Sequence, residues 1–313
     1  MAGTVAYGEP YAQGRRAAIW IAQVAKDGVK VTYEDEPYNA KFSGSRGEQL
    51  SSPAQLLAPW RGELLLASGR RLLRWSSTVR MEPELVGSMP GRITAICPGW
   101  PLAGDSRGNI RIWSMKERRG NSYPVAYEMG LTAPIVSLGY YTRDRRCLQG
   151  CIIDSDDDSQ GSCLLVGVSD EVLVADLRRS TIEYGFPVAA PPRLLAGSLP
   201  RVVVGGDQGV LLHDAEHARE TVLLAAADAQ GRYRPTALDL SPHGTILAAV
   251  QVTDPAGDSA GTELFRWDWS GKLVRRDRVA PPHAEIVHII SQSSSVRGIL
   301  LVDSTGAVHT VPA

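Results

Sequence analysis

Short apolar segments, separated by turn residues at nearly regular intervals, are the feature that most constrains the fold of this 313-residue chain. Each segment is about five to eight residues long and is bounded by Gly, Pro, Asp or Ser. Examples are GELLLASGR (62–70), GNIRIWSM (108–115) and RVVVGGDQG (201–209). Hardly any segment carries the sustained apolar period of 3.6 residues that indicates a helix. The pattern therefore predicts an all-β fold with few helices.

The apolar segments also recur in order along the chain. They form pairs joined by a tight turn, and the second member of a pair often ends in an aromatic or polar residue. These end positions are Trp20, Trp75, Trp113, Ala175, His213, Trp267 and Thr310. Their successive separations are 55, 38, 62, 38, 54 and 43 residues. The mean unit is about 45 residues, close to the roughly 40–45 residues of a four-stranded propeller blade.

Several segments resemble the blades of WD-repeat β-propellers. In 102–115, LAGDSRGNIRIWSM, the spacing resembles a blade's central hairpin with Trp113 ending the third strand. In similar positions the chain has His213-Asp214 and a literal Trp267-Asp268 pair. Arg107 stands where the family usually has an aspartate. The matching segments are 102–115, 202–215, 236–250, 263–274 and 282–290.

This resemblance implies one WD-repeat-like β-propeller over residues 1–313, with seven four-stranded blades. Each blade buries one face against its neighbour, so such a ring must close. The last unit ends at AVHTVPA without a fourth strand, and the chain begins with GTVAYGEP. We therefore expect N- and C-terminal strands to close the ring; six blades plus an irregular unit is the alternative. Residues 34–55 and 143–162 are expected to be loop insertions.

Composition narrows the class of protein. The net charge is −1, with 33 basic and 34 acidic residues, whereas nucleic-acid binders usually have a basic excess. Four cysteines do not make a disulfide scaffold. The N-terminal residues lack the apolar core of a signal peptide, and no run approaches the ~18 apolar residues of a membrane span. We expect an intracellular protein, cytoplasmic or nuclear, without membrane insertion.

The acidic stretch CIIDSDDDSQGSC (151–163) allows several interpretations. Asp154, Asp156 and Asp158 have the spacing of the first calcium-loop ligands, but the turn glycine and the bidentate glutamate are missing. Ser155 precedes three aspartates and is a candidate phosphorylation site. Cysteines 147, 151 and 163 lack the paired Cys-x-x-Cys of zinc sites. A solvated acidic loop is favoured, with no metal and no cofactor.

Partner contacts are expected from an exposed aromatic and from arginines. Trp100 lies in the turn PGWP (98–101), where an exposed indole would anchor an interface, although packing in the core is equally compatible. Basic clusters occur near 116–119, 143–146, 178–179 and 275–278. An arc formed by such clusters would meet phosphates or an acidic protein, and solvated strand ends are the alternative. We predict contacts at Trp100, Arg118, Arg119, Arg145 and Arg146.

No catalytic motif is evident in the sequence. A nucleophile elbow, a phosphate-binding loop and a dinucleotide fingerprint are all missing. Asp105, Asp207 and Asp303 precede turns in matching positions; they would either converge as channel carboxylates or hydrogen-bond their own turns. The favoured function is a non-catalytic scaffold for protein subunits or peptides. The alternatives are a nucleic-acid-associated subunit using an arginine rim and a propeller enzyme with a carboxylate site.

Overall fold

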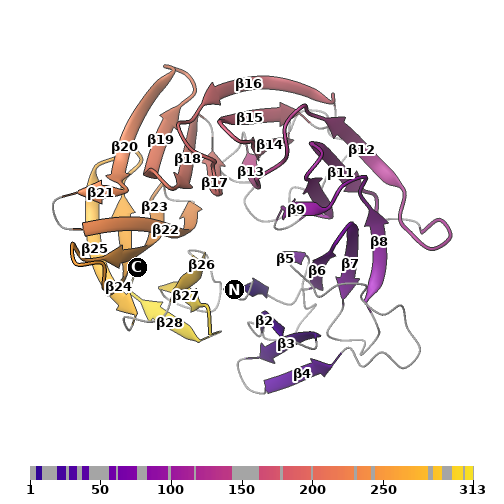
Figure 1. Cartoon of the computed structure of the whole chain (residues 1–313), viewed down its shortest axis with the longest axis horizontal. Helices are drawn as coiled ribbons and strands as arrows, with labels where there is room; N and C mark the ends of the chain where they lie inside the picture. The colour runs from indigo at the N-terminus through magenta and orange to yellow at the C-terminus, as the bar shows by residue number, and fades with distance from the viewer. Residues whose placement is uncertain are drawn as a thin grey trace. The chain divides into compact units, whose positions relative to one another are not determined.

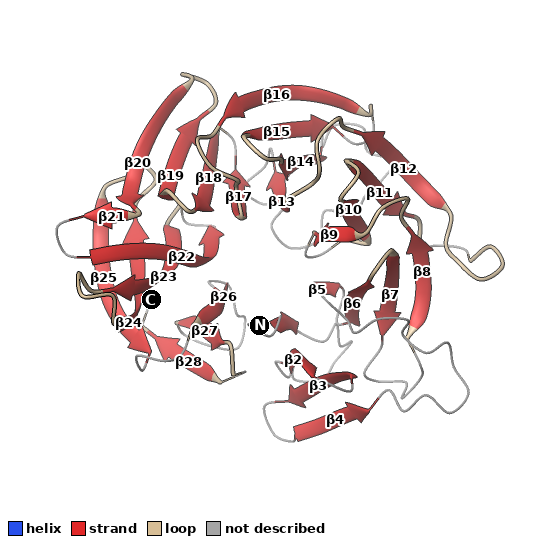
Figure 2. Cartoon of the chain, viewed as in Figure 1, coloured by secondary structure: helices blue, strands red, loops and turns tan. Residues whose placement is uncertain are grey.

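A computed structural model provides the structure of the chain. It describes residues 5–8, 20–25, 28–33, 37–41, 56–60, 63–75, 83–97, 100–115, 118–142, 162–176, 179–198, 200–228, 231–240, 244–280, 285–290, 298–305 and 307–312. Strands and turns account for these residues, and none of them is helical (Figure 2). None therefore belongs to a helix that would cross a membrane. The expected all-β class is confirmed.

The chain divides into two compact units, Met1–Val136 and Ser137–Ala313. The first unit contains three four-stranded antiparallel sheets, each built from consecutive strands (Figure 1). Their strands are β1 (Val5–Gly8), β2 (Trp20–Ala25), β3 (Gly28–Tyr33) and β4 (Pro37–Lys41); β5 (Leu56–Trp60), β6 (Glu63–Ser68), β7 (Arg71–Trp75) and β8 (Glu84–Ser88); and β9 (Ile93–Ile96), β10 (Leu102–Asp105), β11 (Asn109–Trp113) and β12 (Val125–Gly130).

The second unit contains an eight-stranded, a five-stranded and a three-stranded sheet. Their strands are β13 (Ser137–Thr142), β14 (Ser162–Gly167), β15 (Glu171–Asp176), β16 (Thr181–Pro187), β17 (Leu194–Ser198), β18 (Arg201–Gly206), β19 (Gly209–Asp214) and β20 (Arg219–Ala225); β21 (Ala227–Asp228), β22 (Gly231–Leu240), β23 (Ile246–Thr253), β24 (Ser259–Trp267) and β25 (Leu273–Ala280); and β26 (Ile286–Ile290), β27 (Ile299–Asp303) and β28 (Val308–Val311). The eight-stranded sheet is two antiparallel meanders, β13–β16 and β17–β20, joined by parallel pairing of β13 with β17.

Tight turns join the second and third strands of the meanders. Gly108 has φ of 87° and Gly209 has φ of 105°, a conformation that glycine adopts readily. A Cβ at position 108 would lie 2.3 Å from the carbonyl oxygen of Leu131. The turn glycines singled out by the sequence pattern are therefore required by the backbone, and they set the register of the β10–β11 and β18–β19 hairpins.

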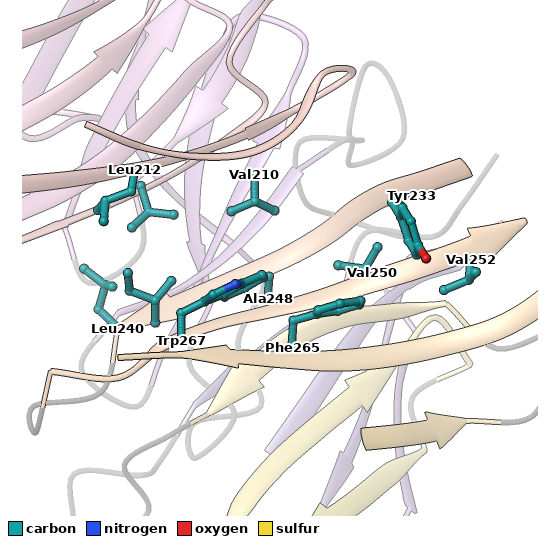
Figure 3. Close-up of a cluster of buried hydrophobic side chains, with 11 residues drawn as sticks. Val210, Leu212, Tyr233, Leu240, Ala248, Val250, Val252, Phe265 and Trp267 are labelled. Atoms are coloured by element: carbon teal, nitrogen blue, oxygen red, sulfur yellow. The ribbon is translucent and has the colours of Figure 1, made fainter. Parts of the chain in front are cut away.

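The core lies between successive sheets. In the second unit, Val210 and Leu212 of β19 pack against Tyr233, Phe265 and Trp267 of the next sheet (Figure 3). Phe265 and Trp267 are stacked, with ring centroids 5.5 Å apart. The other face of the β22–β25 sheet packs on β26–β28, and the β13–β16 and β17–β20 meanders share a further cluster. Each of these sheets thus covers an apolar face of its neighbour, as the repeat requires.

In the first unit, the indole of Trp113 lies against β8. A Cβ at Gly87 would be 2.0 Å from the indole nitrogen of Trp113, so glycine leaves the room that the ring occupies. Trp113 is buried with Val86, Met89 and Ile93. The aromatic residue that ends β11 therefore joins the β9–β12 sheet to the β5–β8 sheet.

Three expectations need correction. Strand β1 pairs with β2 in its own sheet, so an N-terminal strand at Val5–Gly8 does not complete the last sheet. Val5 and Tyr7 of β1 pair with Gln23 and Ile21 of β2, so the neighbouring strand in the sequence occupies this hydrogen-bonding edge of β1. Trp20 was expected to end the second segment of a strand pair, but it begins β2. The residue that ends the third strand of the first sheet is Tyr33. Finally, residues 37–41 form β4, although they fall within the segment 34–55 expected to be a loop.

Candidate interaction surfaces

Trp100 lies in the turn between β9 and β10, as the sequence predicts. Its backbone amide donates to the carbonyl of Cys97 at 3.4 Å, and its carbonyl accepts from the amide of Leu102 at 2.8 Å. The residue is half-buried. Trp100 therefore combines anchoring in the β9–β10 turn with an exposed portion, and it remains a candidate contact residue.

Arg118 belongs to a charge network centred on Glu84 of β8. Its Nη1 lies 2.9 Å from Glu84 Oε1, and its Nη2 donates to the carbonyl of Asn121 at 3.2 Å. Tyr123 donates its hydroxyl hydrogen to Glu84 Oε2 at 3.2 Å, and Arg74 Nη1 lies 3.9 Å from the same oxygen. Burial and the neighbouring Glu84 carboxylate raise the pKa of Tyr123. Arg118 thus fastens the β11–β12 connection to β8 and presents only part of its guanidinium to solvent.

Arg119 lies at the start of a turn beyond this network. Its amide donates to the carbonyl of Ser122 at 3.0 Å, and the residue is exposed. The other predicted positions, Arg145, Arg146 and Ser155, lie outside the described residues, as do Cys147 and Cys151. Within the first unit, therefore, the structure brings Arg118 and Arg119 together on the β11–β12 connection.

The other basic clusters are balanced by local acceptors wherever the structure describes them. On β25, Arg275 pairs with Asp277 at 2.7 Å and Arg276 pairs with Glu263. Arg276 also lies over the ring of Phe265, 5.0 Å from its centroid. Arg278 donates to the carbonyl of Ala260 at 2.6 Å. These arginines bind their own sheet, which weakens the case for a phosphate-binding arc.

The three aspartates considered as channel carboxylates have different environments. Asp105 is buried, and its carboxylate accepts from the amides of Gly91 at 2.6 Å, Arg107 at 2.8 Å and Asn109 at 2.9 Å. Burial raises the pKa of Asp105, but these hydrogen bonds outweigh it and hold the pKa below its usual range. The Asp105 carboxylate therefore stabilises the β10–β11 turn by accepting these hydrogen bonds.

Asp303 has the same role in the last sheet. Its Oδ1 accepts from the amides of Thr305 at 2.8 Å and Ala307 at 3.0 Å, and its Oδ2 lies 2.8 Å from His309 Nε2. Asp207 is exposed and forms an ion pair with Arg193 at 2.9 Å. The interpretation in which such aspartates hydrogen-bond their own turns is therefore correct for Asp105 and Asp303, whereas Asp207 is a surface residue.

His213 lies near the end of β19, as Trp113 lies at the end of β11 and Trp267 at the end of β24. Its ring stacks on Phe186 with a centroid separation of 3.7 Å, and its Nε2 lies 2.6 Å from the hydroxyl of Tyr184. Burial lowers the pKa of His213, and Asp214 offsets this in part. The imidazole therefore substitutes for an indole as a packing element between β16 and β19.

Cys97 is a buried side chain beside Trp100. Burial raises the pKa of its thiol to about 12, so the thiolate that binds metals is disfavoured there. Among the residues that the structure describes, no cluster of His, Cys, Asp and Glu has a geometry that would hold a metal ion.

Exposed apolar side chains on peripheral strands are the feature that sequence reasoning missed. Val222 is 58% exposed on β20 and Val274 is 65% exposed on β25. The others are Val125 on β12, Ile182 on β16, Leu273 on β25 and Val308 on β28. A run such as Val222-Leu223-Leu224 has the composition of a buried strand. The signal that would have revealed exposure is its place as the last strand of a meander.

Comparisons with known proteins identify the fold. No family model and no curated protein matches the sequence. A chain in the crystal structure of the mitotic checkpoint complex matches with a TM-score of 0.67 and 14% identity, over 99% of this chain and 87% of that one. The structure of BBS1N in complex with ARL6DN matches with a TM-score of 0.64 and 13% identity, over 100% of this chain and 93% of that one. The chain thus has an all-β, β-propeller fold.

Proposed function

We propose that this chain is a non-catalytic scaffold, a propeller subunit of an intracellular multiprotein complex that binds protein subunits or peptides. The observation that carries the proposal is the distribution of exposed apolar side chains. Inner strands such as β10 and β27 are buried along their whole length, whereas Val125, Ile182, Val222 and Val274 are exposed on fourth strands. Partners that bury such side chains gain free energy from the hydrophobic effect.

Two further observations support this proposal. The two similar structures, the mitotic checkpoint complex and BBS1N with ARL6DN, are both protein complexes, and the chain matches their fold. Of the three aspartates with the spacing of channel carboxylates, Asp105 and Asp303 accept hydrogen bonds from their own turns, and Asp207 is an exposed partner of Arg193. We further propose that the seven meanders are seven blades, the eight-stranded sheet supplying two of them.

Purification of the protein from its own cells tests the scaffold proposal. A short affinity tag inserted between Ala256 and Gly257 sits in an exposed turn, where insertions are tolerated. We expect protein partners in stoichiometric amounts that persist after nuclease treatment. Partners that disappear with nuclease would favour the nucleic-acid-associated alternative, and a protein that purifies alone would contradict the scaffold.

Surface variants then locate the binding region. Val222→Asp and Val274→Asp place a charge on exposed apolar positions, so we expect loss of at least one partner with an unchanged melting temperature. Trp100→Ala and Arg119→Ala test the contact residues predicted from the sequence. Glu220→Ala, a substitution of an exposed polar residue on the same strand as Val222, is the matched control.

A further inference from the structure

The last sheet of the second unit ends in a strand with a single neighbour. The order β26-β27-β28 leaves the far edge of β28 unpaired among the described strands, whereas the other meanders continue to a fourth strand. Strand β28 comprises Val308, His309, Thr310 and Val311, three of which are β-branched residues that favour extended structure. The second unit therefore presents an open edge composed of residues suited to strand pairing.

The open edge also lacks the usual protection against pairing. Exposed edges are normally blunted by charged residues or proline within the strand. Each of the fourth strands carries at least one lysine, arginine, aspartate or glutamate: Lys41 on β4, Glu84 on β8, Glu128 on β12, Glu183 on β16, Arg219 on β20 and Arg275 on β25. Strand β28 contains none of these residues. A strand of this composition is expected to pair with a further strand at its outer edge.

The pairing of β28 with β27 determines which backbone groups face outward. Asp303 donates its amide hydrogen to the carbonyl of Ala307 at 3.0 Å, and the register continues through Leu301↔His309. Hydrogen-bonded pairs alternate along an antiparallel ladder, so His309 and Val311 bond to β27. The amides and carbonyls of Val308 and Thr310 therefore point to the open edge, and these two residues are exposed.

A cationic group lies on the face of the neighbouring sheet that packs against β26–β28. Arg266 is 6% exposed; its Nη2 donates to the carbonyl of Pro312 at 2.7 Å and lies 3.0 Å from Asp277. Arg275, which is 46% exposed, binds the same carboxylate at 2.7 Å. The Nε of Arg266 is buried without a hydrogen-bond partner within the described part of the chain. Two guanidinium groups thus share one carboxylate on the sheet whose strand β25 contacts β28.

We propose that β28 is a docking edge at which an extended segment of a partner protein pairs as a fourth strand and places an acidic side chain toward Arg275 and Arg266. The unpaired backbone groups of Val308 and Thr310 supply the affinity that strand addition requires. The excess of positive charge selects a segment with Asp or Glu on that face. This inference rests on the proposed function and specifies how one partner binds.

Amide hydrogen exchange on the full-length protein tests whether the edge is open. We expect the amides of Val308 and Thr310 to exchange at least about 100-fold faster than that of His309, because only His309 is bonded to β27. Equal protection in the isolated protein would overturn the proposal. It would mean that a segment of this chain, or a second copy if protection depends on concentration, already covers β28.

A displayed library of random eight-residue peptides tests the partner's chemistry. We expect peptides selected on the full-length protein to alternate apolar and polar residues and to contain Asp or Glu. Thr310→Pro removes one outward amide and should weaken a selected synthetic peptide at least about tenfold, whereas Thr310→Val should leave affinity within about twofold. Arg275→Gln should weaken binding about fivefold. Val308→Glu, which retains the backbone but places a negative charge beside an acidic segment, provides a second blocking variant should Thr310→Pro fold poorly.

The two proposals fail in different ways. A library that yields no peptide sensitive to Thr310→Pro or Val308→Glu overturns the docking edge, whatever the tagged protein co-purifies with. If every partner that survives nuclease remains bound to the Thr310→Pro protein, the scaffold is upheld and strand addition at β28 is contradicted. Absence of any partner would instead contradict the proposed function.

Discussion

At the scale of single residues, buried polar side chains organise the turns of this protein. Asp105 accepts three backbone hydrogen bonds while almost fully shielded from water, and Asp303 repeats the arrangement next to His309. Removing such a carboxylate leaves backbone amides without their acceptor, and this costs most free energy where the donor is buried, as it is at Gly91. These residues are therefore expected to matter for stability.

Asp105→Ala should lower the free energy of unfolding by about 3 kcal/mol, because Gly91, Arg107 and Asn109 lose their acceptor. Urea unfolding followed by tryptophan fluorescence measures the change. Asp207→Ala is the matched control, since Asp207 precedes the corresponding turn but is exposed beside Arg193. It should cost less than about 0.5 kcal/mol. Equal costs for the two variants would refute the assignment.

His213 gives the folded protein a pH dependence near neutrality. Its pKa in the folded state lies below the ordinary value of 6.5, so the folded state favours the neutral imidazole. This contribution is present above about pH 6.5 and is lost as the pH falls through that value toward the folded-state pKa. His213→Phe keeps the stack on Phe186 and should reduce the fall in melting temperature between about pH 7.5 and about pH 5.5.

A His213→Phe protein with an unaltered pH profile would show that another group titrates.

At the scale of elements, sheet-to-sheet packing depends on small residues opposite large ones. Gly87 on β8 faces the indole of Trp113, whereas Gly130 on β12 has open space around it. Gly87→Ala should destabilise the protein by more than about 2 kcal/mol, because neither the backbone of β8 nor the enclosed ring has room to move. Gly130→Ala should stay within about 0.5 kcal/mol. The denaturant concentration at which each variant is half unfolded measures the difference, provided that the unfolding free energy of both variants depends equally on denaturant concentration.

The strands and hairpins also differ in how far they could be predicted from the sequence. Hairpins such as β10–β11 and β18–β19 were predictable because turn glycines and apolar runs are local signals. The partner of Arg118 was not, since Glu84 is distant in sequence and is brought close only by the packing of β8. Exposure of Val222 was equally hidden, because a fourth strand has the composition of a core strand. Strand β1 also pairs locally where closure with the last sheet was expected.

At the scale of the whole molecule, charge balance opposes general binding to nucleic acid. The net charge is −1, and the described arginines on β25 are bound to acceptors of their own sheet. We expect a 20-nucleotide single-stranded RNA to bind no more tightly than about 1 μM at about 150 mM salt. Fluorescence anisotropy over a salt series measures this affinity. Tight binding with a steep salt dependence, lost in the Arg118→Ala/Arg119→Ala double variant, would establish the alternative instead.

The local pairing of β1 with β2 has a consequence for how this protein is made. Every described meander uses strands that follow one another in the chain, and β13 pairs with β17 of the very next meander. On a ribosome that adds about 5–20 residues per second, each meander of about 40 residues would emerge roughly 2–8 seconds after the one before it. Within each unit, the apolar face of a newly made sheet is then exposed only for those seconds, until the next meander packs on it. The first sheet has all four of its paired strands once Lys41 has been added.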